Sequence, residues 1–459
     1  MANAGLRRGG ADMTQGDIFR HLLVFAIPLL LGDVFQQMYN MVDTWVVGNF
    51  VNDEAFSAVG SVTPIVNLLI RTFMGFSTGA SVVVAQYYGA KNREKVHDAV
   101  HTAVALTAVL SLAFTALGLT LVPFLLRLMK TPADVFPESQ TYLTIFIAGL
   151  SGMLFYNMGS AILRAVGDSR RPFYYLVTAA VLNVVLDLVF VIGFGMGVEG
   201  VAWATVIAQG VSAILTAATL LRTSTWVRVV PRDIRFSGHI MQQVLRVGIP
   251  GALQMAITAF SNVFVQSYIN QFGKFVMGGW TAYHKMEQLL FLFMQSLSHA
   301  ATTFVGQNLG KGQEERAKEG VKIALRMSIA ATAVCGVVVM AFAPQFVSFF
   351  NSTPEVIHYG TLLMRVQTPF MVACCANQIY AAALRGAGNS KTPMYVMLCS
   401  FVFFRQIYLF VMSNFIANKL LPLAMGYPAG WVLCTILITY YYKHTPLLKT
   451  RLVAEENKG

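Results

Sequence analysis

The residues most able to do chemistry in this chain are polar side chains that interrupt its first long apolar segment, from His21 to Gly48. They are Asp33, Gln36, Gln37, Asn40, Asp43 and Thr44. At about 100° per residue, a helix places all six within one arc of roughly 120°, and the rest of its circumference is apolar. An ionised carboxylate at the depth of a bilayer is costly, so this arc cannot face lipid. We therefore expect this helix to face protein or to line a water-filled pathway.

The composition of the chain is that of a membrane protein. Of its 459 residues, 56% are hydrophobic and only 12% are charged, and the mean hydropathy is +0.60. A soluble protein carries about twice that charged fraction. The first apolar run is too long for a secretory signal peptide and no cleavage site follows it. The net charge of +12 would be compatible with nucleic-acid binding, but the basic residues lie in short gaps between apolar runs, which favours membrane topology instead.

The apolar runs predict twelve membrane-spanning helices. Their approximate ranges are 20–48, 54–87, 95–122, 139–166, 173–194, 198–221, 239–271, 275–309, 316–343, 354–385, 391–416 and 423–443. Several are longer than a bilayer requires, so we expect tilted or kinked helices. Pro28, Pro64, Pro250 and Pro369 fall inside spans, where each removes a backbone donor and permits a bend.

Lys and Arg predict the orientation of the spans. One set of alternate loops, together with both tails, carries most of these residues. The other set holds only Arg127, Lys130, Lys274 and Lys419. Because cytoplasmic loops carry the excess of positive charge, both termini are expected in the cytoplasm of a bacterial inner-membrane protein.

An internal repeat divides the chain into two homologous halves. LRAVGDSRRP, from Leu163 to Pro172, recurs as LRGAGNSKTP, from Leu384 to Pro393, and AQYYGAKNREK recurs as GQNLGKGQEER at the same offset. In the first pair, Gly167 and Gly388 are expected to stop a helix at its cytoplasmic end. The repeat predicts two parallel six-helix bundles, 17–221 and 239–443, with a cytoplasmic linker at 222–238 and tails at 1–16 and 444–459.

These features together resemble the multidrug and toxic compound extrusion (MATE) family. The most specific motifs are PLLLGDVFQQMYNMVDTWVVG, AQYYGAKN, LRAVGDSRRP and LNVVLDLVFVIGFGMGVEGVAWAT. The resemblance implies an all-α polytopic membrane protein with twelve helices in two pseudo-symmetric six-helix bundles, forming a V around a central cleft. It also implies an antiporter that exports amphipathic organic compounds or drugs by alternating access, in exchange for H⁺ or Na⁺.

The same resemblance implies a cation site in the N-terminal bundle, made by Asp43, Asn183, Asp187 and Thr205. Spacing agrees with part of it, because Asn183 and Asp187 are four residues apart and share a helix face. Burial and a neighbouring acid both favour holding a proton, and the oxygens of the four side chains equally suit Na⁺. The alternative is that the acids are satisfied by amides and only hold the helices in register.

The predicted seventh span contains no acid and the tenth has only Glu355 at its very start, whereas one branch of the family has further carboxylates in these spans. This favours the DinF-like branch.

For the substrate cleft, the candidate residues are Asp33, Gln36, Gln37 and Asn40 in the first span and His284, Glu287 and Gln288 in the eighth. Three arginines inside predicted spans, Arg71, Arg365 and Arg405, are more simply interpreted as structural salt bridges or carbonyl caps than as a positive cleft wall for anionic or zwitterionic cargo.

Enzymatic functions are disfavoured, because the chain has no GxSxG, HExxH, P-loop or CxxC motif. We expect no cofactor beyond the coupling ion, five cysteines that act as packing residues, and a monomer whose partners are a small-molecule substrate and the lipid bilayer. The alternative functions are a lipid or lipid-linked-sugar flippase of a related superfamily and a membrane scaffold that transports nothing.

Overall fold

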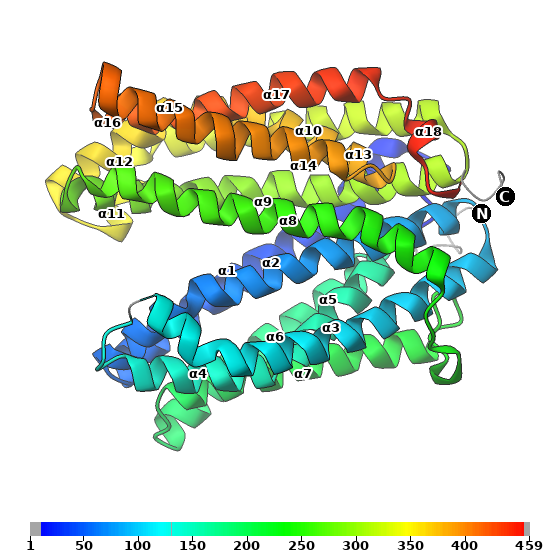
Figure 1. The fold of residues 1–459 in the computed structure, drawn as a ribbon, viewed down its shortest axis with the longest axis horizontal. Helices are drawn as coiled ribbons and strands as arrows, with labels where there is room; N and C mark the ends of the chain where they lie inside the picture. The colour runs from blue at the N-terminus through cyan, green and yellow to red at the C-terminus, as the bar shows by residue number, and fades with distance from the viewer. Residues whose placement is uncertain (1–10, 130, 454–459) are drawn as a thin grey trace. The chain divides into compact units, whose positions relative to one another are not determined.

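The computed structural model describes residues 11–129 and 131–453, and all their regular structure is helical (Figure 1). The first half contains α1 (Ile18–Phe50), α2 (Asp53–Gly89), α3 (Arg93–Leu128), α4 (Phe136–Ala148), α5 (Leu150–Ala165), α6 (Arg170–Asp187) and α7 (Val198–Arg222). The second half contains α8 (Gly238–Asn270), α9 (Lys274–Gly310), α10 (Glu314–Ala341), α11 (Ala343–Phe350), α12 (Pro354–Gln367), α13 (Met371–Gly386), α14 (Lys391–Leu398), α15 (Arg405–Val411), α16 (Leu420–Ala424), α17 (Gly426–His444) and α18 (Leu447–Thr450). Three π-helical segments, Leu188–Gly193, Cys399–Phe404 and Met412–Ile416, continue α6, α14 and α15, and 3₁₀ turns lie at Pro231–Asp233 and Thr368–Phe370.

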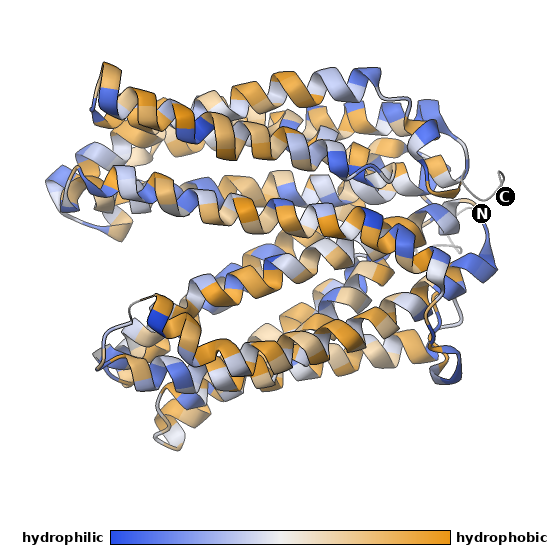
Figure 2. Cartoon of the chain, in the orientation of Figure 1, coloured by the Kyte–Doolittle hydropathy of each residue, from blue (hydrophilic) through white to orange (hydrophobic). Residues whose placement is uncertain are grey.

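Most predicted spans appear as single long helices, coloured as hydrophobic along most of their length in Figure 2. Among the described residues, ten helices are long and apolar enough to cross a membrane, and α4 with α5, bent by 46° at their junction, would make eleven. The remaining predicted span, 354–385, is divided into α12 and α13 by the 3₁₀ turn that contains Pro369. Proline lacks the backbone N–H that would continue the helix, so the interruption falls where the sequence predicts a bend.

The chain forms two compact units whose boundaries fall at the two Ile-Pro pairs of the repeat. The first unit contains Ile27–Gly248, and the second contains Met13–Ala26 together with the chain from Ile249 onward. The predicted bundles instead began at residues 17 and 239, so the observed change-over lies further along each leading helix. Residues 1–10 and 454–459 of the predicted tails, and Lys130, lie outside the described residues.

Hydrogen bonds explain why Met13–Ala26 belongs to the second unit. Met13 is fully buried, and its backbone N–H donates to Gln307 Oε1 at 3.0 Å. Asn308 Nδ2 donates to the Met13 carbonyl at 3.3 Å, and an Arg316 guanidinium nitrogen donates to the Gly16 carbonyl at 2.8 Å. Gln307 and Arg316 lie in the repeat motif GQNLGKGQEER, so one copy of the repeat motif holds the start of the chain.

The other repeated motif is a helix stop in both halves, as predicted. Gly167 and Gly388 have positive φ angles of 87° and 94°. Beyond them, Asp168 N–H donates to the Leu163 carbonyl at 3.0 Å, and Asn389 N–H donates to the Leu384 carbonyl at 2.9 Å. This left-handed cap satisfies carbonyls that the end of a helix leaves without partners.

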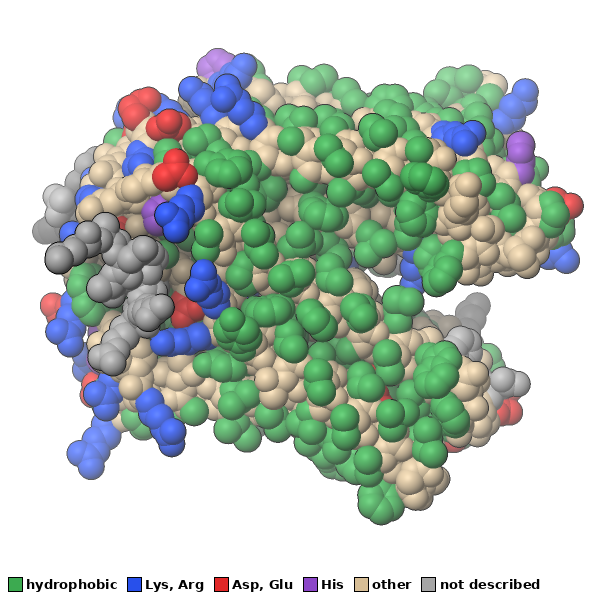
Figure 3. All heavy atoms as spheres, turned by 180° about the vertical axis from the view of Figure 1, so that it is seen from behind, with side chains coloured by type: hydrophobic (Ala, Val, Ile, Leu, Met, Phe, Trp, Pro, Cys, Tyr) green, Lys and Arg blue, Asp and Glu red, His purple; other side chains and the backbone are tan. Residues whose placement is uncertain are grey.

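The surface of each unit is consistent with a lipid environment. Figure 3 shows hydrophobic side chains covering the middle of each unit, with Lys and Arg side chains gathered toward one end. Large apolar side chains such as Leu112, Ile214 and Phe349 are exposed to more than half of their area. Contiguous exposed apolar surface of this kind is unfavourable in water and favourable in a bilayer.

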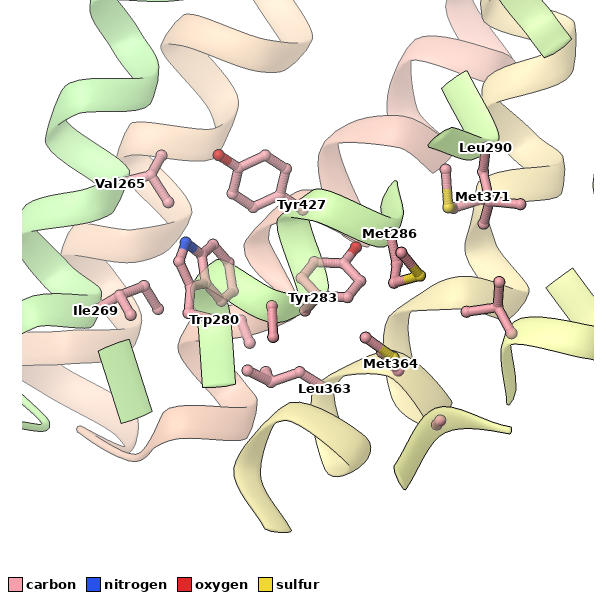
Figure 4. Packing of buried hydrophobic residues seen from close by; sticks show 14 of the residues in the cluster. Val265, Ile269, Trp280, Tyr283, Met286, Leu290, Leu363, Met364, Met371 and Tyr427 are labelled. Carbon is pink, nitrogen blue, oxygen red and sulfur yellow. The ribbon is translucent and has the colours of Figure 1, made fainter. Parts of the chain in front are cut away.

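The second unit has an aromatic and Met-rich core, shown in Figure 4. Trp280 and Tyr283 of α9 lie at its centre, with Met364 of α12 and Met371 of α13 nearby. Cys374 and Cys375 pack in the same cluster, and all five cysteines are free thiols. The cysteines of this core therefore act as small packing residues.

Candidate functional site

The four residues predicted for the cation site are all buried in the first unit. Asp43 lies on α1, Asn183 and Asp187 on α6, and Thr205 on α7. The four-residue spacing of Asn183 and Asp187 gives them the same helix face, and both side chains are at least 98% buried. α6 and α7 pack along each other, which brings Thr205 to the same interior.

The polar atoms of these side chains are largely without partners. Among the described residues, no hydrogen bond reaches Asp43 Oδ1, either carboxylate oxygen of Asp187, either amide atom of Asn183 or the Thr205 hydroxyl. Buried polar groups in proteins are nearly always hydrogen-bonded, because an unpaired one retains its full desolvation cost. These oxygens and the amide are therefore available to bind a proton or a cation.

The two acids interact with each other. The carboxyl groups of Asp43 and Asp187 are close enough for direct electrostatic and hydrogen-bonding interaction. Two ionised carboxylates at such range repel, particularly away from water. A shared proton or a bound cation removes that repulsion.

Three further polar residues belong to this cluster and were not among the predicted site residues. The Tyr39 hydroxyl interacts with the side chains of Gln36 and Gln209, and Tyr39 is within electrostatic range of both acids. Tyr142 of α4 lies within the same range of Asp43 and Asp187. Tyr39 precedes Asp43 by one helical turn and Gln209 follows Thr205 by one turn. Their spacing from predicted site residues could therefore have identified both from the sequence. Tyr142 had no comparable signal, because it comes from a helix without a predicted site residue.

The backbone changes geometry at the site. α6 is α-helical up to Asp187, and from Leu188 to Gly193 it is π-helical. Such segments shift the helix register and are common at functional sites. Asp187 therefore lies where one helical register gives way to another.

The other polar residues of α1 do not join the acid pair. Asp33 is half-buried and within electrostatic range of Arg164 of α5, and Gln37 is half-buried. Asn40 is exposed, as is Thr44, whose hydroxyl donates to the Asn40 carbonyl at 2.9 Å. The polar arc of α1 thus divides into a buried part at Asp43 and a more exposed part, whose contact with substrate stays a prediction.

The polar residues of the eighth predicted span, which forms α9, also differ in exposure. Gln288 is exposed, whereas Glu287 is buried and its carboxylate contacts the ring of His284. Their assignment to a substrate cleft stays a prediction.

Of the three arginines, Arg71 is exposed and Arg365 Nε donates to the Met340 carbonyl at 3.5 Å, a carbonyl contact of the kind expected. Arg405 is buried among side chains of the second unit.

The family model described as MatE matches the chain twice, over residues 28–189 and 250–411. The chain belongs to the MATE family. Both matches begin at the proline of an Ile-Pro pair, which agrees with the internal repeat. The resemblance drawn from the motifs is confirmed, and the protein is a multi-pass membrane protein of a transporter family.

Relatives and solved structures of the MATE family cover nearly the whole chain. A probable multidrug resistance protein of Bacillus subtilis, YpnP, is 26% identical over 95% of this chain and 98% of its own. A probable multidrug resistance protein of Thermotoga maritima, NorM, is 27% identical over 89% of each chain. The structure of a multidrug resistance MATE transporter in an outward-facing conformation has a TM-score of 0.90 at 23% identity, covering 95% of this chain and 97% of that one. This likeness confirms the predicted all-α polytopic fold.

Proposed function

We propose that this protein is a cation-coupled antiporter that exports amphipathic organic compounds or drugs, and that Asp43, Asn183, Asp187 and Thr205 bind the coupling ion. The observation that carries the proposal is the group of buried oxygens without hydrogen-bond partners in these four side chains. Its support from relatives is that two of them are named probable multidrug resistance proteins.

The coupling ion is H⁺ or Na⁺. A proton would be held between the carboxyl groups of Asp43 and Asp187, where it cancels one of two neighbouring negative charges. Na⁺ would take the same carboxylate oxygens, with the Asn183 carbonyl and the Thr205 hydroxyl as further ligands. Either ion changes the charge beside α1 by one unit, and Pro28 gives that helix a place to bend in response.

Substrate contacts would come from polar side chains that remain partly or fully exposed. On α1 these are Asp33, Gln36, Gln37 and Asn40, and on α9 they are His284 and Gln288. Buried Glu287 would act on substrate through His284. Because no acid lies on α8 or α13, the site in the first unit favours the DinF-like branch of the family.

The proposed setting is the inner membrane of a bacterium, with both termini in the cytoplasm and a monomer as the working unit. The excess of Lys and Arg in alternate loops supports this orientation. A reporter enzyme active only in the cytoplasm, fused after His444, tests it: activity is expected, and inactivity of a well-expressed fusion would reverse the orientation.

Transport in proteoliposomes tests the function. Substrate movement should follow an imposed pH or Na⁺ gradient, and Asp43→Asn and Asp187→Asn should each lower the gradient-driven rate at least about tenfold. Asp134→Asn is the matched control, because this acid is exposed in the loop before α4 and, among the described residues, accepts only from the neighbouring Val135 N–H. Full gradient-driven transport by both site variants would remove the site assignment, and transport indifferent to either gradient would remove the antiport mechanism.

A further inference from the structure

The second unit contains a buried acid that the proposed cation site does not use. Glu287 lies on α9 with a side chain only 6% exposed. Its Oε2 contacts Nδ1 of His284, one turn earlier on the same helix. Among the described residues, His284 Nε2 has no hydrogen-bond partner, and the His284 side chain is 27% exposed.

A buried arginine balances the charge of this acid without pairing directly with it. Arg405, at the start of α15, is 3% exposed and donates to Asn262 Oδ1 at 2.7 Å and to Ser261 Oγ at 3.2 Å, both on α8. It is within electrostatic range of Glu287, although no hydrogen bond joins them. The Arg405 Nε atom is buried without a partner.

Aromatic rings bring the histidine and the arginine together. The His284 ring meets Trp280 edge-on, with centroids 4.6 Å apart, and meets Tyr427 of α17 at 5.6 Å. The Arg405 guanidinium lies over the same Tyr427 ring at 4.6 Å. Figure 4 shows Trp280, Tyr283 and Tyr427 close together in this part of the core.

Few other ionisable groups face Glu287. They are Tyr283 of its own helix, Cys374 of α13 and Tyr427 of α17, together with Arg405. The three hydroxyl and thiol groups are neutral near pH 7. The charge of this cluster therefore depends on Glu287, Arg405 and the protonation of His284.

We propose that His284 and Glu287 form a proton-exchange site in the second unit. Nδ1–H of His284 donates to the Glu287 carboxylate, which fixes the tautomer and leaves Nε2 as the atom that takes up or releases a proton. The proton comes from water and returns to water, and its uptake converts neutral imidazole to imidazolium. The net charge of the cluster then rises by one.

Protonation would be transmitted through Tyr427. An imidazolium at His284 places a second cation against the ring that Arg405 already contacts, and the two positive charges repel. Arg405 links α15 to α8, so its displacement would loosen that link. A role for this step in transport rests on the proposed antiport function, whereas the proton-exchange site itself does not.

Histidine NMR on the full chain in lipid nanodiscs tests the site directly. With histidine labelled at Cε1, the resonance missing from His284→Gln belongs to His284 among the eight histidines. Its chemical shift should change with pH, and Glu287→Gln should alter that pH dependence, because the carboxylate that accepts from Nδ1 is gone. Lys285→Gln is the control: this neighbouring side chain is exposed, and the pH dependence of the His284 resonance should stay unchanged.

A His284 resonance that does not respond to pH, or a pH dependence that Glu287→Gln leaves unchanged, would overturn the proposal. Trp280 provides a second readout, because protonated imidazole quenches a neighbouring indole. The contribution of Trp280 to the fluorescence is the part that is absent from Trp280→Phe. This contribution should decrease on acidification of the wild type and stay unchanged in His284→Gln. Neither measurement depends on transport. The cation site at Asp43 and Asp187 and the proton-exchange site at His284 and Glu287 can therefore fail independently of each other.

Discussion

The carboxyl groups of Asp43 and Asp187 meet in the interior of the first unit, although the two residues lie on helices far apart in the chain. Nothing among the described residues donates a hydrogen bond to either oxygen of Asp187. When both carboxyls are ionised, the pair therefore carries a repulsion that no other described residue offsets. This relationship makes the effect of each acid dependent on the other.

A double-mutant cycle measures that dependence. At strongly alkaline pH without Na⁺, once both carboxyls are ionised, Asp43→Asn and Asp187→Asn should each raise the unfolding temperature, because either change removes the repulsion between the carboxylates. The double variant should gain little beyond one single variant, with a coupling energy of about 0.5–3 kcal/mol. Thermal unfolding in detergent checks this, with Asp134→Asn expected to leave stability unchanged. Additive effects of the two substitutions would show that the acids are energetically independent.

The helix stops at Gly167 and Gly388 should tolerate alanine poorly. Both have positive φ angles, and an added Cβ at Gly167 would lie 2.3 Å from the Ala11 carbonyl oxygen. At Gly388 the nearest atom would be Leu452 Cγ at 2.9 Å, which can move. We expect each alanine variant to lose about 1–3 kcal/mol of unfolding free energy, with the larger loss at Gly167.

Gly60→Ala is the control for these variants. Gly60 lies inside α2, and an added Cβ there would meet no atom within 4 Å. Helix propensity then predicts a gain of up to about 1 kcal/mol. Equal thermal stability of all three alanine variants would contradict the strain argument.

The linker after α7 is fastened to α3 by His101. Its ring is buried, with Nδ1 bonded to the His97 carbonyl at 2.7 Å and Nε2 accepting the Val230 N–H at 2.9 Å. His97 and His101 lie close enough to Asp233 to hold a metal ion, but both nitrogens of His101 are already used by backbone groups. This arrangement is a clamp for the linker, and it requires a neutral His101.

Loss of this clamp should expose the linker to proteases. His101→Ala should let trypsin cut after Arg228 and Arg232 several-fold faster, because Val230 N–H loses its partner. In the wild type, acid should have the same effect, since a protonated Nε2 cannot accept a hydrogen bond. His444→Ala is the control, because within the described chain that exposed ring bonds only to the Tyr440 carbonyl of its own helix. Unchanged cleavage of His101→Ala would show that other contacts hold the linker.

Helix breaks were only partly predictable from the sequence. The interruption between α12 and α13 falls at Pro369, whose effect on the backbone is local. The break between α4 and α5 falls at Gly149, where an added Cβ would lie 2.2 Å from Val206 of α7. That close approach of two helices depends on tertiary packing, which periodicity in one segment does not contain.

By itself, the sequence determined the membrane class, the span positions, the repeat and the set of polar residues that cannot face lipid. Those properties follow from the hydropathy and backbone chemistry of each segment taken alone. Only the tertiary structure decided which polar residues of different helices meet: it joins Asp43 to Asp187, exposes Asn40 and places Arg405 over the Tyr427 ring. The physical reason is that such pairings depend on the rotation and crossing of neighbouring helices, which burial of apolar side chains across the whole unit fixes together.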